Sequence, residues 1–205
     1  MGEDYYSYIN KFFKKFAPFY DLITLPVLPV RAKVVELTGA KKGSKILDVC
    51  TGTGAQAFAF GRRGYEVVGI DLSEDMLKVA ERKNGYENVS FGIADASVMP
   101  FGDKHFDVSC ISFGLHDMPH EIREKVLDEM RRVSKKIVVI DYNIPQNRIH
   151  RWFQVFFISL YESKYFKDFA RQNFKRLLHQ HNLKIKKEIH ILLDAFGIFI
   201  CEVAN

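Results

Sequence analysis

Cysteine is scarce in this sequence, with three residues among 205. Cys50, Cys110 and Cys201 lie in apolar stretches, and they form neither a Cys-x-x-Cys pair nor a cluster with histidine. These absences exclude a disulfide framework and a cysteine-based zinc site, and they predict reduced, buried thiols in a cytoplasmic protein. We expect no metal site in the chain.

Long hydrophobic runs are absent as well. The longest apolar run, from Trp152 to Leu160, is too short to span a bilayer, which takes about 20 residues. The first residues include Glu3 and Asp4 and lack the roughly 7–15-residue apolar core of a secretory signal. The sequence therefore predicts neither a membrane-spanning nor a secreted protein.

Charge of one sign does not dominate the chain. It has 30 Lys and Arg against 25 Asp and Glu, a net charge of +5. This modest excess is compatible with an anionic membrane surface or with nucleic acid and requires neither. Aromatic residues, by contrast, are abundant, with 18 Phe and 9 Tyr. Many of these aromatic residues fall in residues 5–30 and 152–174, outside the stretches that are predicted to be β-strands.

Two short stretches outline a nucleoside site. Residues 45–55 are an apolar run that ends in a turn of small residues, and residues 65–72 are an apolar run that ends near Asp71. Gly52 and Gly54 let the backbone approach a ligand without an intervening Cβ. Asp71 stands where a carboxylate can accept hydrogen bonds from two ribose hydroxyls. We expect two neighbouring parallel strands with one ligand at their carboxyl ends.

The glycine spacing fits two classes of ligand. Gly52-x-Gly54-x-x-Ala57, with Asp71 downstream, also satisfies the dinucleotide pattern. Asp48 discriminates between these two classes. It lies just before the glycines, where its negative charge would repel the pyrophosphate of a dinucleotide. A carboxylate there suits the ammonium and sulfonium groups of S-adenosylmethionine (SAM). The alternative for Asp48 is a purely structural cap of the turn or of the next helix.

Three longer segments carry a resemblance to a known family: Ile46-Leu-Asp-Val-Cys-Thr-Gly-Thr-Gly54, Gly69-Ile-Asp-Leu-Ser-Glu-Asp-Met-Leu77 and Ala94-Asp-Ala-Ser-Val-Met-Pro-Phe-Gly-Asp-Lys-His-Phe-Asp107. In order and spacing they resemble the motifs of class I SAM-dependent methyltransferases. The branch most similar is that of the ubiquinone/menaquinone C-methyltransferases and related lipid methyltransferases, through Ala17-Pro-Phe-Tyr-Asp-Leu22 and Ser112-Phe-Gly-Leu115. The chain departs from that branch at Cys50, where the family has glycine, and at His116-Asp117, where it has Arg-Asn.

The resemblance and the βα alternation predict one fold. It is an α/β, three-layer αβα sandwich with a Rossmann-like, mostly parallel seven-stranded sheet and an antiparallel C-terminal strand. We expect strands near residues 45–49, 65–70, 88–93, 106–111, 136–141, 183–189 and 195–203. We expect helices near 31–38, 54–63, 73–84, 119–133, 149–161 and 166–181.

A single domain, residues 1–205, is expected to have four parts. They are an N-terminal helical lid (1–30), a SAM-binding core (31–142), a helical substrate-side insertion (143–181) and a C-terminal hairpin (182–205).

The resemblance also implies a set of cofactor-binding residues: Asp48, Thr51, Gly52, Gly54, Asp71, Leu72, Met76, Asp95, Ala96, Ser112 and Phe113. Asp95 would bond the adenine amino group and Ala96 would offer its N–H to the ring, although Asp95 could instead cap a helix. Met76 would pack on adenosine, or be ordinary core. Ser112 and Phe113 would face the methionine end of the cofactor.

Two residues are candidates for proton transfer or substrate contact. His116 lies after the fourth expected strand and could act as a base near pH 7. Its alternative is a hydrogen-bonded histidine at a strand–helix junction. Tyr20 could reach the cofactor from the lid.

These observations predict a SAM-dependent methyltransferase that moves a methyl group by in-line displacement to a small, lipophilic acceptor, a quinone-like ring or a lipid headgroup. Peripheral membrane contact fits the aromatic segments, and nucleic acid is disfavoured. The alternatives are an RNA methyltransferase and a SAM-binding subunit without catalysis, while Asp48 argues against an NAD-dependent oxidoreductase. The oligomeric state is open.

Overall fold

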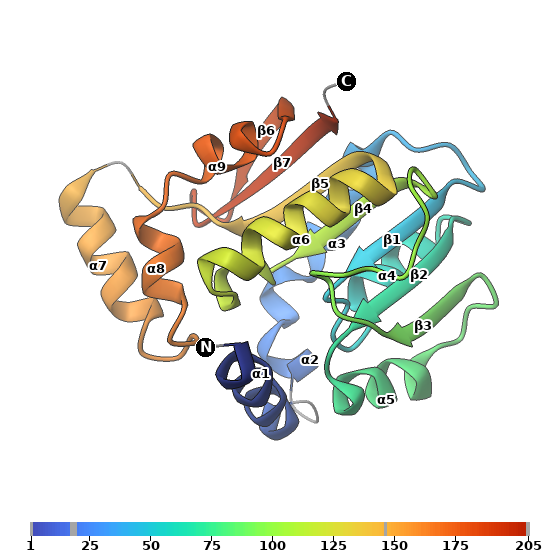
Figure 1. The fold of residues 1–205 in the computed structure, drawn as a ribbon, viewed down its shortest axis with the longest axis horizontal. Helices are drawn as coiled ribbons and strands as arrows, with labels where there is room; N and C mark the ends of the chain where they lie inside the picture. The colour runs from blue at the N-terminus through green and yellow to red at the C-terminus, as the bar shows by residue number, and fades with distance from the viewer. Residues whose placement is uncertain (1, 17–19, 146, 204–205) are drawn as a thin grey trace.

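The structure is a computed structural model that describes residues 2–16, 20–145 and 147–203. Within them seven strands form one sheet in the order β3-β2-β1-β4-β5-β7-β6 (Figure 1). The strands are β1 (Lys45–Val49), β2 (Glu66–Asp71), β3 (Val89–Ile93), β4 (Phe106–Ser112), β5 (Ser134–Tyr142), β6 (Leu183–Ile191) and β7 (Phe196–Val203). The first five are parallel, and β7 runs antiparallel to both β5 and β6. The predicted α/β fold is confirmed.

The helices lie where the sequence periodicity places most of them. They are α1 (Gly2–Phe16), α2 (Tyr20–Ile23), α3 (Leu28–Thr38), α4 (Ala55–Gly61), α5 (Glu74–Lys83), α6 (His120–Val133), α7 (Arg148–Ile158), α8 (Phe166–Arg171) and α9 (Phe174–Gln180), with 3₁₀ turns η1 (Leu25–Val27) and η2 (Leu115–Asp117). Among the described residues, none of these helices is long and apolar enough to cross a membrane.

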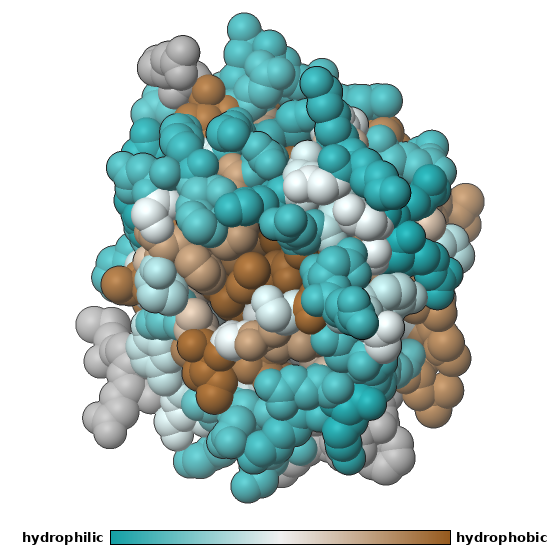
Figure 2. All heavy atoms as spheres, turned by 90° about the vertical axis from the view of Figure 1, so that its right-hand side faces the viewer, coloured by the Kyte–Doolittle hydropathy of each residue, from teal (hydrophilic) through white to brown (hydrophobic). Residues whose placement is uncertain are grey.

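Alternating side chains of the buried strands pack on the two faces of the sheet. On one face, Leu47 and Ile111 join a core with α6, α8 and α9. On the other face, Ile46 and Cys110 join a core with α3 and α4. Figure 1 shows α6 in front of the sheet and α4 behind it. The face toward β3 is largely hydrophilic around one apolar hollow (Figure 2).

The order of strands reverses at β1, which pairs with β2 on one side and β4 on the other. Helices therefore leave β1 and β4 toward opposite faces, and a crevice opens at the carboxyl ends of these strands. Residues that follow β1, β2, β3 and β4 meet at this crevice.

One segment differs from the expected elements. The helix expected at residues 166–181 is two short helices, because the chain leaves helical geometry at Gln172 and restarts where the Asn173 side chain caps α9 by accepting the N–H of Arg176. In the expected lid, residues 2–16 form one continuous helix. Pro29 falls in the first turn of α3, where proline is tolerated.

Candidate functional site

A cleft of about 660 Å³, including its open mouth, occupies the crevice at the carboxyl ends of the strands. Nine predicted site residues line it, together with α1 and α6: Tyr20, Gly52, Asp71, Leu72, Met76, Asp95, Ala96, Ser112 and Phe113. The structure thus brings together residues that lie up to 93 positions apart in the sequence (Tyr20 to Phe113).

Asp71 ends β2 with both carboxylate oxygens engaged by the backbone. Oδ2 accepts the N–H of Gly52 at 2.8 Å, and Oδ1 accepts the N–H of Ser73 at 2.9 Å. Burial raises the pKa of Asp71, and these N–H donors oppose that shift. Each oxygen keeps a further lone pair. Asp71 therefore ties the glycine turn to β2 and retains the capacity to accept bonds from a diol in the cleft.

Asp95 lies under the N-terminal helix. Its Oδ2 accepts a hydrogen bond from the Tyr6 hydroxyl at 2.7 Å, and its Oδ1 accepts the N–H of Ser97 at 2.8 Å. No helix begins at this position in the described chain, so the alternative of a helix cap is wrong. Asp95 instead stabilises a local turn and anchors α1 over the cleft.

Asp48 and Thr51 line an adjoining pocket of about 330 Å³ that shares Tyr20, Gly52 and Phe113 with the main cleft. Asp48 is 1% exposed, and its Oδ2 accepts the Thr51 hydroxyl at 2.6 Å. Burial raises the pKa of Asp48 to about 7 against its ordinary 3.8. The backbone N–H of Ala57, in α4, also donates a hydrogen bond to Asp48. Asp48 therefore also has the structural role that the sequence left open, a contact with the helix that follows the turn. A cationic ligand would relieve the buried charge.

The turn after β1 adopts left-handed backbone conformations. Gly54 has φ +81°, and a Cβ there would meet the Phe91 and Phe58 rings at 2.8 and 2.9 Å. Cys50 and Phe113 have φ of 55° and 58° without being glycine. Such conformations cost about 1–3 kcal/mol and gather at ligand sites. Cys50 thus has the conformation for which the related branch uses glycine, and Gly54 supports the site without lining it.

Helices α1 and α2 close one side of the cleft. Tyr5, Ile9 and Phe13 of α1 line it beside Tyr20 of α2. Asp21 holds α2 in place: it accepts the Thr53 hydroxyl at 2.6 Å and lies 2.5 Å from the Lys83 ammonium. In the sequence, only the resemblance of Tyr20-Asp21 to the family motif points to this contact. Thr53 and Lys83 are both far from Asp21 in the chain.

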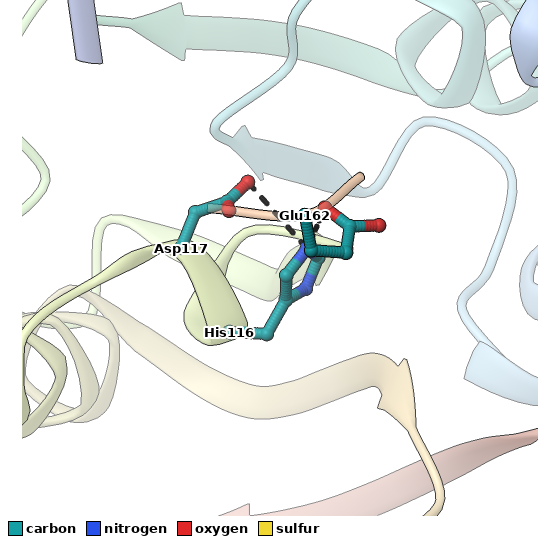
Figure 3. Close-up of side chains that lie close together, drawn as sticks. All are labelled: His116, Asp117 and Glu162. Atoms are coloured by element: carbon teal, nitrogen blue, oxygen red, sulfur yellow. Dashed lines mark hydrogen bonds and ion pairs between the residues drawn. The ribbon is translucent and has the colours of Figure 1, made fainter. Parts of the chain in front are cut away.

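His116 is buried and does not line the cleft; Asp117 does. The Nδ1 atom of His116 lies 2.8 Å from Asp141 Oδ1. Its Nε2 atom lies 3.3 Å from Glu162 Oε2 and 3.5 Å from Asp117 Oδ2. Figure 3 shows Asp117 and Glu162 both directed at the ring. Burial alone lowers the pKa of His116, but the Asp117 and Asp141 carboxylates outweigh it and raise that pKa well above 6.5.

Sequence reasoning missed three residues of this site. Arg31 lines the smaller pocket with Asp48, is 8% exposed, and has a buried Nε without a hydrogen-bond partner. Asp141 and Glu162 hold His116 from other elements. Asp141 carried a usable signal, a carboxylate at the end of a buried strand, whereas Arg31 and Glu162 carried none because their helix and loop positions are unremarkable in sequence.

A second hollow, of about 670 Å³, lies at the amino ends of β1, β2 and β3. It is lined in part by Lys45, Val67, Val89 and Phe106, and it contains none of the predicted site residues. Ligands of open α/β sheets bind at the carboxyl ends of the strands. The larger open hollow is therefore not the candidate site.

The fold and the cleft define a Rossmann-like protein that presents carboxylates and a glycine turn to a nucleoside ligand. Comparison with known families makes this specific: residues 4–163 match the ubiE/COQ5 methyltransferase family, and the chain belongs to it. The cofactor of this family is SAM, as predicted.

Curated relatives agree with this family, and a solved structure shares the fold. The chain is 38% identical over 142 residues to a demethylmenaquinone methyltransferase of Renibacterium salmoninarum, covering 65% of this chain and 58% of the relative. It is 38% identical over 128 residues to the ubiquinone/menaquinone biosynthesis C-methyltransferase UbiE of a Shewanella species, covering 57% and 50%. The chain thus spans about half the length of such relatives. A SAM-dependent methyltransferase from Aquifex aeolicus superposes with a TM-score of 0.64 at 19% identity, covering 85% of this chain and 89% of that one, which shows a shared fold.

Proposed function

We propose that this protein transfers the methyl group of SAM to a small, lipophilic, quinone-like acceptor by in-line displacement. The observation that carries the proposal is the single cleft in which Asp71, Asp95 and the pocket of Asp48 meet an apolar wall from α1 and α6. The relatives named for demethylmenaquinone and ubiquinone/menaquinone methylation support the acceptor class.

Each cofactor residue has a proposed task. Asp71 accepts the ribose hydroxyls and Asp95 the adenine amino group, while Leu72, Met76 and Ala96 contact the adenosine. Asp48 and Thr51 face the cationic methionine end, beside Ser112 and Phe113, and Arg31 can pair with its carboxylate. SAM supplies an activated methyl group, so the remaining tasks of the protein are alignment and exclusion of water.

The proposal extends to the N-terminal helices and to His116. Tyr20 lines both pockets from α2, where it can close on the methionine end of the cofactor. His116 does not line the cleft and is separated from it by Asp117, so it is not placed to contact the acceptor directly. Residues 1–30 are proposed as the lid, 31–142 as the cofactor core, 143–181 as the substrate-side segment and 182–205 as the closing hairpin.

The lining of the cleft disfavours nucleic acid. No Lys or Arg is among its described lining residues, and Arg31 is buried in the smaller pocket. A phosphate backbone requires exposed Lys and Arg at the contact. An RNA acceptor is therefore the weaker alternative.

A peripheral membrane contact is proposed for α7. Its large apolar side chains are exposed: Ile149, Trp152, Phe153, Phe156 and Phe157 are each between 48% and 66% exposed. The helix has two arginines and no acidic residue. An apolar face flanked by cationic side chains suits the headgroup region of an anionic membrane, where a lipophilic acceptor would dissolve.

The direct test is methyl transfer from labelled SAM to a demethylated menaquinol, with RNA as a competing acceptor. We expect turnover of the quinol and no transfer to RNA. Transfer to RNA that falls steeply between 50 and 200 mM salt, without quinol turnover, would reverse the assignment. SAM binding with no turnover of lipophilic acceptors would leave a non-catalytic subunit.

A further inference from the structure

We propose that His116, Asp117 and Glu162 bind one divalent metal ion beside the cleft. The three residues come from η2 and from the loop after α7, and their ligand atoms all lie within 4.8 Å of one another. Figure 3 shows the two carboxylates converging on one ring nitrogen of His116. The sequence, with its scarce cysteines, gave no reason to expect such a site.

The orientation of the imidazole is fixed by Asp141. His116 Nδ1 lies 2.8 Å from Asp141 Oδ1, and the same carboxylate accepts the backbone N–H of His116 at 3.2 Å and of Tyr142 at 2.8 Å. Since Asp141 is a fully buried acceptor, Nδ1 carries a proton. This carboxylate–histidine arrangement leaves the Nε2 lone pair as a ligand atom and is typical of metal-bound histidines.

The distances at Nε2 fit ligands across an ion better than hydrogen bonds. Nε2 lies 3.3 Å from Glu162 Oε2 and 3.5 Å from Asp117 Oδ2. A charge-assisted N–H···O bond is about 2.7–2.9 Å long. Two ligands each about 2.0–2.2 Å from a tetrahedral metal stand about 3.4 Å apart. Both observed separations match the second value.

One proton on His116 does not neutralise the negative charge of the cluster. The carboxylates of Asp117, Asp141 and Glu162 surround one imidazole, and protonation of that ring would offset one negative charge of three. Asp117 is 7% exposed, and its buried Oδ1 has no hydrogen-bond partner. A buried carboxylate oxygen in this state is costly. A divalent cation would offset two of these charges, in addition to the hydrogen bond that Asp117 receives from Ser163.

The surroundings hold the ligands in place. The Tyr142 hydroxyl donates to Glu162 Oε1 at 2.5 Å, and the rings of Tyr142, Phe166 and Phe169 pack around His116 with centroids 5.0, 6.2 and 6.3 Å away. One imidazole nitrogen and two carboxylates suit Mn²⁺, Co²⁺ or Zn²⁺, whereas Mg²⁺ and Ca²⁺ prefer oxygen ligands alone.

The open side of the ion would face the cleft, because Asp117 lines the cleft beside Met118 and Ile122. Resting on the proposed function, the ion would hold a hydroxyl oxygen of the acceptor and favour its anionic form. Metal binding itself can be measured without SAM or acceptor, so its failure and that of methyl transfer are separate results.

The experiment titrates the chelator-treated full chain with Mn²⁺ and Co²⁺ by calorimetry, and it records the Co²⁺ absorption spectrum. We expect one equivalent to bind, with His116→Gln and Glu162→Gln each weakening affinity at least tenfold. Asp141→Asn, which changes the partner of His116 Nδ1 without removing a metal ligand, should weaken metal affinity about 10–100-fold. SAM binding by each variant reports that the fold persists.

The matched control is His120→Gln. It removes an exposed histidine whose Nε2 lies 3.5 Å from Glu124 Oε1, a similar pair outside the cluster. This variant should bind metal like the parent. The proposal is overturned if the parent binds no stoichiometric ion, with His116 protonated on both nitrogens by NMR, or if binding survives His116→Gln and Glu162→Gln.

Discussion

Asp48 shows how burial at one residue can couple proton binding to cofactor binding. Its pKa is raised by burial to about 7 in the free protein, so the carboxyl holds a proton below neutrality. A cationic methionine end favours the carboxylate and therefore expels that proton. We expect SAM affinity to fall up to tenfold per unit as the pH decreases below 7. Calorimetry in buffers of different ionisation enthalpy should show proton release at pH 6.

The same group has an opposite effect on the stability of the free protein. Because the folded pKa of Asp48 is above its ordinary 3.8, the folded state binds the extra proton between these values. The contribution of Asp48 to stability is therefore present at low pH and lost as the pH rises toward 7. Asp48→Asn should remove both pH dependences. If Asp48→Asn keeps the pH dependence of SAM affinity, the proton is released by another group.

Asp71 provides a second residue-level prediction. Its carboxylate accepts two backbone N–H groups and is proposed to accept the ribose hydroxyls. Hydrogen bonds to a charged group contribute about 1.5–3 kcal/mol each. Asp71→Ala should weaken SAM binding at least tenfold in a calorimetric titration. Glu74→Ala, at an exposed site nearby in α5, is the control and should bind normally. Unchanged affinity in Asp71→Ala would remove the ribose assignment.

At the scale of elements, α1 and α2 are held over the cleft by few polar contacts. Tyr6 donates to Asp95, and Asp21 accepts from Thr53. Tyr6→Phe combined with Asp21→Ala should loosen both helices, which would lower the rate of methyl transfer about tenfold while circular dichroism stays unchanged. Lys11→Ala, on the exposed side of α1, is the control. Full activity in the double variant would show that these contacts do not close the site.

The α7 helix carries the second element-scale prediction. Trp152, Phe153 and Phe156 are exposed by 48–61%, so their replacement by serine removes little from the core. The triple variant should keep its melting temperature and lose sedimentation with anionic phospholipid vesicles. The parent should bind neutral vesicles more weakly than anionic ones. Retained vesicle binding by the variant would place the contact elsewhere.

The whole molecule depends on the central strands more than on its surface. Leu47 of β1 is 0% exposed and packs in the core with α6. Leu47→Ala should lower the free energy of unfolding by about 2–5 kcal/mol, the range for buried leucine truncations. Leu193→Ala, at a fully exposed leucine, should change it little. Urea unfolding measures both, and equal effects would contradict the assigned core.

Much of the fold could be predicted because its signals are local. The apolar runs around Leu47 and Val139 predict strands from their own residues, without knowledge of the neighbouring strands. The turn with Gly52 and Gly54 is recognisable because glycine readily adopts its backbone conformation. The break between α8 and α9 was missed, since Asn173 competes with a helical periodicity that continues through it.

The sequence by itself determined the βα order, the family and the carboxylates at the strand ends, because each depends on residues close together in the chain. Only the tertiary structure decided which side chains meet. It set Tyr6 against Asp95, buried Arg31 near Asp48, and enclosed His116 between Asp141 and Glu162. Such pairs join residues 17 to 89 positions apart. Their distances follow from packing of the whole chain, which no local pattern encodes.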